Sequence, residues 1–136
     1  MVIKNLMRKI SEKSSGHHGT YDETYTAYQT RRSSWRQWVR DHYLRAAASY
    51  AIGPSLDFGC GAGELLNHLP RGSLGIEYNQ ATVEYCNRKG LDVLSYDGFK
   101  DDFSLSGVPW QGRASTLYLS HVLEHFDDPV HILTRL

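Results

Sequence analysis

Short apolar runs alternate with amphipathic stretches through most of this chain. The apolar runs predict β-strands at residues 55–58, 73–77, 91–96 and 113–120. The stretches between them predict helices at residues 64–69 and 81–89, and a further helix that begins at Asp127 or Asp128, just before Pro129. Regular alternation of strands and helices is typical of an α/β fold with a parallel sheet. We therefore expect one α/β domain over residues 33–136.

The first part of the chain has a different pattern. Residues 1–32 are polar and contain glycine, which predicts a mobile or helical arm, with His17 and His18 in a solvated loop. Ser33 or Ser34 is expected to cap a helix that runs to about residue 50. Its aromatic side chains are expected to pack the helix onto the sheet, and the alternative is that they line a substrate pocket. The aromatic residues of this predicted helix include Trp35, Trp38 and Tyr43. Three tyrosines at helical spacing precede it: Tyr21, Tyr25 and Tyr28.

A glycine-rich turn, Gly59-Cys60-Gly61-Ala62-Gly63, follows the first predicted strand. Glycines accept positive φ and let a ligand approach bare backbone, and a helix that starts after the turn would present free N–H groups. The dinucleotide fingerprint G-x-G-x-x-G has its third glycine one residue later, where this chain has Glu64. Asp57 precedes the turn, where its carboxylate repels a pyrophosphate. The site therefore suits a cationic or hydroxyl-rich ligand.

The string from Asp57 to Gly63, Asp-Phe-Gly-Cys-Gly-Ala-Gly, resembles motif I of the class I S-adenosylmethionine-dependent methyltransferases. In that family the glycine turn holds the amino-acid half of the cofactor. The resemblance covers residues 33–136 and implies S-adenosylmethionine as the cofactor. It also implies a Rossmann-like, doubly wound, mainly parallel sheet, with the ligand at the carboxyl ends of the strands around the switch between strands 1 and 4.

Further residues match the family pattern downstream of the turn. Glu77 ends the second predicted strand about 20 residues after Asp57, the interval expected for an acid that accepts hydrogen bonds from ribose hydroxyls. Tyr78 follows and is placed to stack on or flank the adenine. Asp97 matches an acid that takes the exocyclic amine of adenine, although Asp97-Gly98 is also an ordinary turn dipeptide. The predicted cofactor-binding residues are Asp57, Gly59, Cys60, Gly61, Gly63, Glu77, Tyr78, Asp97, Gly98 and Ser120.

The string Leu-Ser-His-Val-Leu-Glu-His-Phe-Asp-Asp-Pro, which ends at Pro129, resembles the segment after strand 4 of small-molecule methyltransferases. In those enzymes the segment forms the floor of the active site, so the resemblance implies His121, and after it His125, as candidate catalytic bases. The same letters spell H-x-x-E-H, an inverted zinc-protease motif. That chemistry needs both histidines on one continuous helix, whereas the Asp-Asp-Pro helix start comes after them.

A divalent ion on Glu124 and His125 is a second metal hypothesis, because small-RNA terminal 2′-O-methyltransferases have a similar Glu-His pair. His121 stands where that family has a further glutamate, so the match is partial. We therefore expect no metal here, and polar residues that line or brace the cleft.

Composition limits the classes of partner. The 136 residues suit a single domain. The 15 basic residues balance 15 acidic ones, so no overall field favours nucleic acid or an anionic membrane. Cys60 and Cys86 form no C-x-x-C pair, which predicts reduced thiols in a cytoplasmic protein. Charged residues interrupt the apolar positions of residues 1–10, so neither a signal peptide nor a membrane span is expected.

The four predicted strand–helix units cover only the cofactor-binding half of the family fold. The chain is therefore expected to be an N-terminal fragment of a longer protein, or to be completed by another chain. Its fourth strand would then be an apolar edge open to self-association.

The expected function is methyl transfer from S-adenosylmethionine to an O, N or C nucleophile of a small molecule, chiefly by positioning of the two reactants. A base would assist where the acceptor is a hydroxyl. One alternative is a nicotinamide-dependent oxidoreductase, against which Asp57 and Glu64 count. The other is a non-catalytic ligand-binding module.

Overall fold

The computed structural model describes residues 34–110 and 114–136. The predicted arm at residues 1–32, with its histidines and tyrosines, lies outside the described residues. In chain order the elements are α3 (Ser34–Ala48), β1 (Ser55–Phe58), the short 3₁₀ helix η1 (Leu66–His68), β2 (Leu74–Glu77), α4 (Gln80–Arg88), β3 (Val93–Ser95), β4 (Thr116–Tyr118), the 3₁₀ helix η2 (Leu123–His125) and α5 (Pro129–Arg135).

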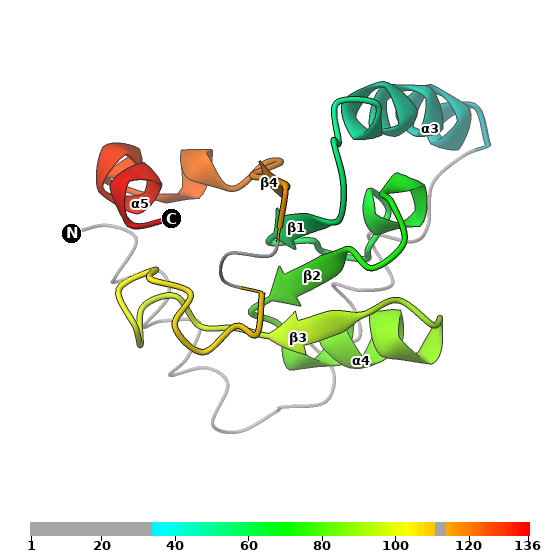
Figure 1. The fold of residues 1–136 in the computed structure, drawn as a ribbon. Helices are drawn as coiled ribbons and strands as arrows, with labels where there is room; N and C mark the ends of the chain where they lie inside the picture. Colours follow the sequence, from blue (N-terminus) through cyan, green and yellow to red (C-terminus); the bar gives the residue numbers. More distant parts are fainter. Residues whose placement is uncertain (1–33, 111–113) are drawn as a thin grey trace.

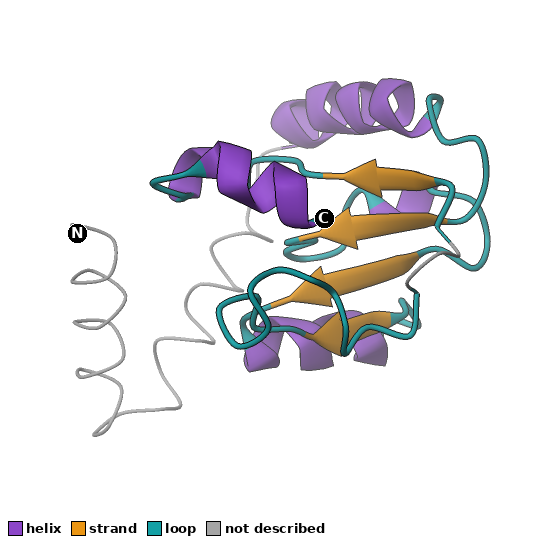
Figure 2. Cartoon of the chain, turned by 60° about the vertical axis from the view of Figure 1, so that its left-hand side comes forward, coloured by secondary structure: helices purple, strands orange, loops and turns teal. Residues whose placement is uncertain are grey.

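The four strands form one parallel sheet in the order β3-β2-β1-β4. Leu56 in the central strand β1 lies opposite Leu74 in β2 and Leu117 in β4. All strand arrows point to the same edge of the sheet (Figures 1 and 2). The direction of winding reverses between β1 and β4, which is the switch point at which doubly wound sheets bind ligands. The predicted α/β, Rossmann-like fold is confirmed.

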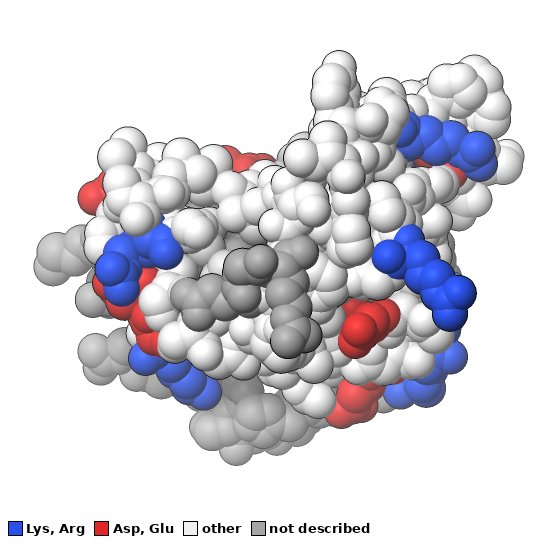
Figure 3. Space-filling model, in the orientation of Figure 1, with Lys and Arg blue, Asp and Glu red and all other residues white. Residues whose placement is uncertain are grey.

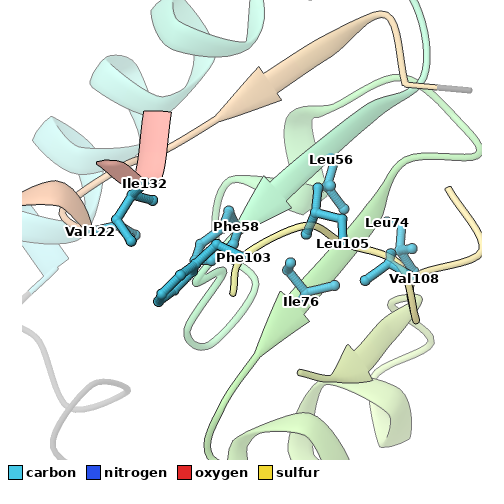
Figure 4. Close-up of a cluster of buried hydrophobic side chains, with 9 residues drawn as sticks. All are labelled: Leu56, Phe58, Leu74, Ile76, Phe103, Leu105, Val108, Val122 and Ile132. Carbon is cyan, nitrogen blue, oxygen red and sulfur yellow. The ribbon is translucent and has the colours of Figure 1, made fainter. Parts of the chain in front are cut away.

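Two apolar clusters cover the two faces of this sheet, because successive strand residues point to opposite sides. The larger cluster joins Phe58 and Ile76 to Phe103 from the loop after β3 and to Val122 and Ile132 from the segment after β4 (Figure 4). The smaller one packs α4 and η1 on the other face and contains Cys60, Leu66, Val83, Cys86 and Val93. The central strands β1 and β2 are therefore buried on both sides, as in other parallel sheets, whereas Leu117 of the edge strand β4 is exposed.

Two predicted helix starts are confirmed in detail. The Asn79 side chain accepts a hydrogen bond from the Thr82 N–H and caps α4, and the Asp128 side chain accepts one from the His131 N–H and caps α5. Both caps satisfy N–H groups that a first helical turn leaves without an internal partner.

The prediction of a crossover helix at residues 64–69 is wrong. Only the three-residue η1 forms between the glycine turn and Pro70. Pro70 and Gly72 follow so closely that there is room for little more than one turn, and helix nucleation is unfavourable at that length. A long helix does not begin at the turn, so the expected contribution of a helix N-terminus to ligand binding falls away.

Helix α3 also differs from expectation. Its aromatic side chains Trp35, Trp38 and Tyr43 are exposed by 55–65%, and Leu44 is its one buried residue. The predicted packing of these aromatic residues onto the sheet is therefore wrong. The helix is attached by the buried Leu44 and by polar contacts, such as the hydrogen bond from the Tyr118 hydroxyl to the Ala47 carbonyl at 3.0 Å. None of the helices in the described part of the chain has the length and apolar character of a membrane span.

Candidate functional site

The glycine turn is built from three left-handed glycines at the carboxyl end of β1. Gly59, Gly61 and Gly63 have φ values of 70°, 53° and 73°. The N–H groups of Gly59 and Cys60 both donate to the Ile76 carbonyl, at 2.8 and 3.1 Å, which ties the turn to β2. The alternate glycines are thus explained by the backbone conformation, which L side chains adopt only with strain.

Glu77, at the end of β2, completes this turn with its side chain. Its Oε2 accepts a hydrogen bond from the Gly61 N–H at 2.9 Å, and its Oε1 accepts one from the Asn79 N–H at 3.0 Å. A carboxylate has about four lone-pair positions, so two acceptor positions remain beside these two bonds. The structure therefore brings Glu77 and the glycine turn together, as the sequence predicts for a ribose-binding acid.

Asp57 lies beneath the same turn and is 2% exposed. Burial raises its pKa to about 7, and the nearby Glu77 carboxylate adds to this effect. In the sheet Asp57 lies between Gly75 of β2 and Tyr118 of β4. A cationic ligand at the turn would favour the ionised form of this carboxyl group.

Cys60 is placed differently from the glycines around it. Its side chain is buried under the turn beside Cys86, and both thiols lie near the Gly61 carbonyl oxygen, at 3.7 and 3.3 Å. The hydrogen bond with Cys86, together with burial, raises the pKa of the Cys60 thiol. The thiol therefore stays protonated and is buried inside the turn, and the Cys60 backbone serves the turn itself, since its carbonyl accepts a hydrogen bond from the Gly63 N–H at 3.0 Å.

Replacement of Gly63 by alanine is expected to lower the free energy of unfolding by about 2–3 kcal/mol, from left-handed strain and overpacking together. A Cβ atom there would lie 2.4 Å from Leu91 Cδ1 and 3.3 Å from Cys86 Sγ. Gly90→Ala is a matched control because Gly90 has a φ of 80° and no atom within 4 Å of its Cβ position. Urea unfolding should show the larger loss for Gly63→Ala. Equal losses would mean that Leu91 moves aside without cost.

The turn after β3 holds the predicted adenine-binding residues. The Asp97 Oδ1 accepts a hydrogen bond from the Phe99 N–H at 3.2 Å, and Lys100 Nζ lies 3.7 Å from its Oδ2. Gly98 is buried, and a Cβ atom there would lie 2.4 Å from the Phe103 ring. Glycine at position 98 therefore makes room for the Phe103 ring. Asp97 has the structural role of an ordinary turn aspartate, and its contact with adenine stays a prediction.

The segment after β4 approaches the glycine turn through Val122, because Val122 Cγ2 lies 2.8 Å from the position of a Cβ atom on Gly59. His121 has a left-handed φ of 56°, which turns Val122 into the core and leaves the imidazole exposed. His121 Nδ1 lies 3.3 Å from Glu124 Oε1, and His125 is exposed in η2. The two histidines do not share a continuous helix, so the geometry of an inverted zinc-protease motif is absent from this segment.

Tyr78 is 66% exposed beside Glu77, and Ser120 is half-buried after β4. Their cofactor roles stay predictions. Within residues 34–110 and 114–136, no group of three or more His, Cys, Asp or Glu side chains is placed to hold a metal ion.

One neighbour of the turn has no signature in the sequence. The guanidinium of Arg40, on α3, forms an ion pair with Glu64, the residue directly after Gly63. The two are 24 positions apart, and a contact at that separation leaves neither a periodic pattern nor a local motif. The placement of Arg40 therefore comes from the fold alone.

The surroundings add two observations. A cavity of about 250 Å³ lies beside the amino ends of β2 and β3, lined by residues such as Pro70, Gly72 and Asp92, and none of the predicted site residues lines it. On the face shown in Figure 3, Lys and Arg side chains of the described residues stand apart along the rim with acidic side chains between them. This face carries no continuous patch of either charge.

A central parallel strand, a turn of left-handed glycines and an acid from the next strand are features of a Rossmann-like nucleotide-binding fold. Class I S-adenosylmethionine-dependent methyltransferases have this fold, in agreement with the resemblance seen in the sequence. Residues 41–136 match the family described as "Methionine biosynthesis protein MetW", and the chain belongs to that family.

Among solved structures, the chain is similar to the plantazolicin methyltransferase BpumL in complex with SAH. The TM-score is 0.47 at 14% sequence identity, and the match covers 100% of this chain and 57% of that chain. This chain thus spans a little over half the length of that methyltransferase. A comparison with curated proteins finds no match.

Proposed function

We propose that this protein binds S-adenosylmethionine at the carboxyl ends of β1 and β2 and transfers its methyl group to an O, N or C nucleophile of a small molecule. The observation that carries the proposal is the Glu77 carboxylate, which holds the glycine turn through the Gly61 N–H and keeps acceptor positions for a diol. Membership of a family described by methionine biosynthesis supports an acceptor of low molecular weight.

The residues present fit this cofactor. The left-handed glycines offer bare backbone, Glu77 suits the ribose hydroxyls, and Asp57 suits a cationic group. When bound, S-adenosylmethionine supplies an electrophilic methyl group on its sulfonium. The protein's own contribution would be to hold the acceptor in line with that methyl group. His121 is the candidate base for a hydroxyl acceptor. Its imidazole is exposed, and the next residue, Val122, packs against Gly59 of the glycine turn.

Two alternatives make different demands on the same turn. A nicotinamide cofactor would place its pyrophosphate at the glycine turn beside the Asp57 carboxylate, which repels it, and Glu64 stands where the dinucleotide pattern has its third glycine. A non-catalytic module would bind the adenosyl ligand and methylate nothing.

Calorimetric titration of the protein with S-adenosylhomocysteine and, separately, with NAD tests the proposal. We expect binding of the first ligand and none of the second. Methyl transfer is then followed as S-adenosylhomocysteine formation across a panel of small hydroxyl, amine and thiol acceptors. NAD binding without S-adenosylhomocysteine binding would favour an oxidoreductase. Binding without turnover on any acceptor would favour the binding module.

A further inference from the structure

Two ion pairs connect helix α3 to the segment that follows the glycine turn. The Arg40 guanidinium contacts Glu64, and His68 Nε2 lies 2.9 Å from Asp41 Oδ1. The Arg40 and Glu64 side chains are 35% and 34% exposed, so this pair lies at the boundary between the protein and solvent. The helix therefore holds a permanent positive charge one residue beyond Gly63.

The two acids at the turn suit the ammonium group of an amino acid but not its carboxylate. Asp57 and Glu77 are acids, suited to an ammonium group and to hydroxyls. Neither can accept a carboxylate without strong repulsion. A ligand with an α-ammonium and an α-carboxylate thus needs a cationic partner other than these two acids. The Arg40 guanidinium is a permanent cation in contact with Glu64, the residue directly after Gly63, and a guanidinium fork matches a carboxylate in shape and charge.

We propose that Arg40 binds the carboxylate in the amino-acid half of the cofactor and turns from Glu64 to do so. The inference rests on the proposed function and names a residue that selects the cofactor by its carboxylate. A partly exposed ion pair contributes little net free energy, so leaving Glu64 costs little.

S-adenosylmethionine and its decarboxylated analogue test this inference, because they differ only in the carboxylate. The wild-type protein is expected to bind S-adenosylmethionine at least about tenfold more tightly than the analogue, the scale of one hydrogen-bonded charge. Arg40→Gln should lose about tenfold for S-adenosylmethionine and bind the analogue as well as before or better, since the analogue carries an extra net positive charge. Arg40→Lys keeps a charge without the fork and should retain part of the preference.

Two further variants separate ligand binding from support of the turn. Arg36→Gln is the matched control, because Arg36 lies on the same helix with its guanidinium 5.6 Å from the Trp35 ring centroid; both affinities should stay unchanged. Glu64→Gln releases Arg40 and should leave the affinity for S-adenosylmethionine unchanged or raise it.

Four outcomes overturn the inference. Equal losses for both ligands in Arg40→Gln would make Arg40 a support of the turn, and so would a loss in Glu64→Gln that equals the loss in Arg40→Gln. A wild-type protein that binds the two ligands equally well, with unchanged affinities in Arg40→Gln, would exclude carboxylate recognition by Arg40. If a folded wild-type protein bound neither ligand, the proposed function would fail and the inference with it.

Discussion

Replacement of Glu77 by glutamine is expected to weaken S-adenosylhomocysteine binding by about ten- to a hundredfold. The substitution keeps the shape of the side chain but removes its charge and half of its acceptor capacity. The Gly61 and Asn79 N–H groups, which donate to Oε2 and Oε1 at 2.9 and 3.0 Å, would then compete with any ribose hydroxyl for one carbonyl oxygen. A hydrogen bond to a charged group contributes about 1.5–3 kcal/mol, which corresponds to this loss of affinity.

Calorimetric titration of the two proteins measures the effect directly. Glu84→Gln is the matched control, since Glu84 is exposed on α4 and accepts a hydrogen bond from Gln80 Nε2 at 3.2 Å. Thermal unfolding without ligand shows how much of the change comes from loosening of the turn. Unchanged affinity in a folded Glu77→Gln protein would remove Glu77 from the ribose site and leave it as a support of the glycine turn.

The sheet was predictable because each of its strands carries a local signal. The strands β1 to β4 arise from short apolar runs bounded by turn residues, and all four lie within their predicted ranges. The caps at Asn79 and Asp128 were predictable for the same reason, because a cap is decided by a side chain and the N–H groups a few positions on. The three positive φ values of the glycine turn are conformations that glycine adopts without strain.

What was not predictable depends on contacts between distant segments. Apolar residues at positions 65, 66 and 69 fit a helix, but Pro70 leaves too little length, and tertiary contacts decide the result. The aromatic pattern of α3 fits packing on a sheet, yet the helix is held by Leu44 and by polar contacts, and its tryptophans stay exposed. The ion pair between Arg40 and Glu64 arises only after the chain has folded.

The candidate site also has a part that local sequence signals predict and a part that depends on packing between distant segments. The motif spacing predicts a ribose-binding acid at Glu77, and the structure places its carboxylate against the Gly61 N–H; the ribose contact itself stays a prediction. The spacing does not show that Cys60 turns its thiol under the loop or that Gly98 makes room for the Phe103 ring. Both are consequences of close packing, in which a side chain goes where space remains.

Replacement of Asp57 by asparagine is expected to stabilise the unliganded protein at pH 8 and to reduce the dependence of its stability on pH. Burial, with the Glu77 charge nearby, raises the pKa of Asp57 from 3.8 to about 7. Between these two values the folded protein keeps a proton that the unfolded chain has released. Stability therefore falls as the pH rises through this range and is greatest at its acid end. Since each tenfold change in proton affinity is worth about 1.4 kcal/mol, the upper limit of the effect is about 4 kcal/mol.

Urea unfolding at a series of pH values from 4 to 8 measures this difference. Asp92→Asn is the control, because Asp92 is exposed just before β3; its curve should run parallel to that of the wild type. A cationic ligand needs the ionised form of Asp57, so wild-type affinity for S-adenosylmethionine should rise with pH up to about 7 while Asp57→Asn shows no such rise. Parallel stability curves for Asp57→Asn and wild type would mean that Asp57 is ionised in the folded protein throughout, and that its charge is balanced by the protein itself rather than by the ligand.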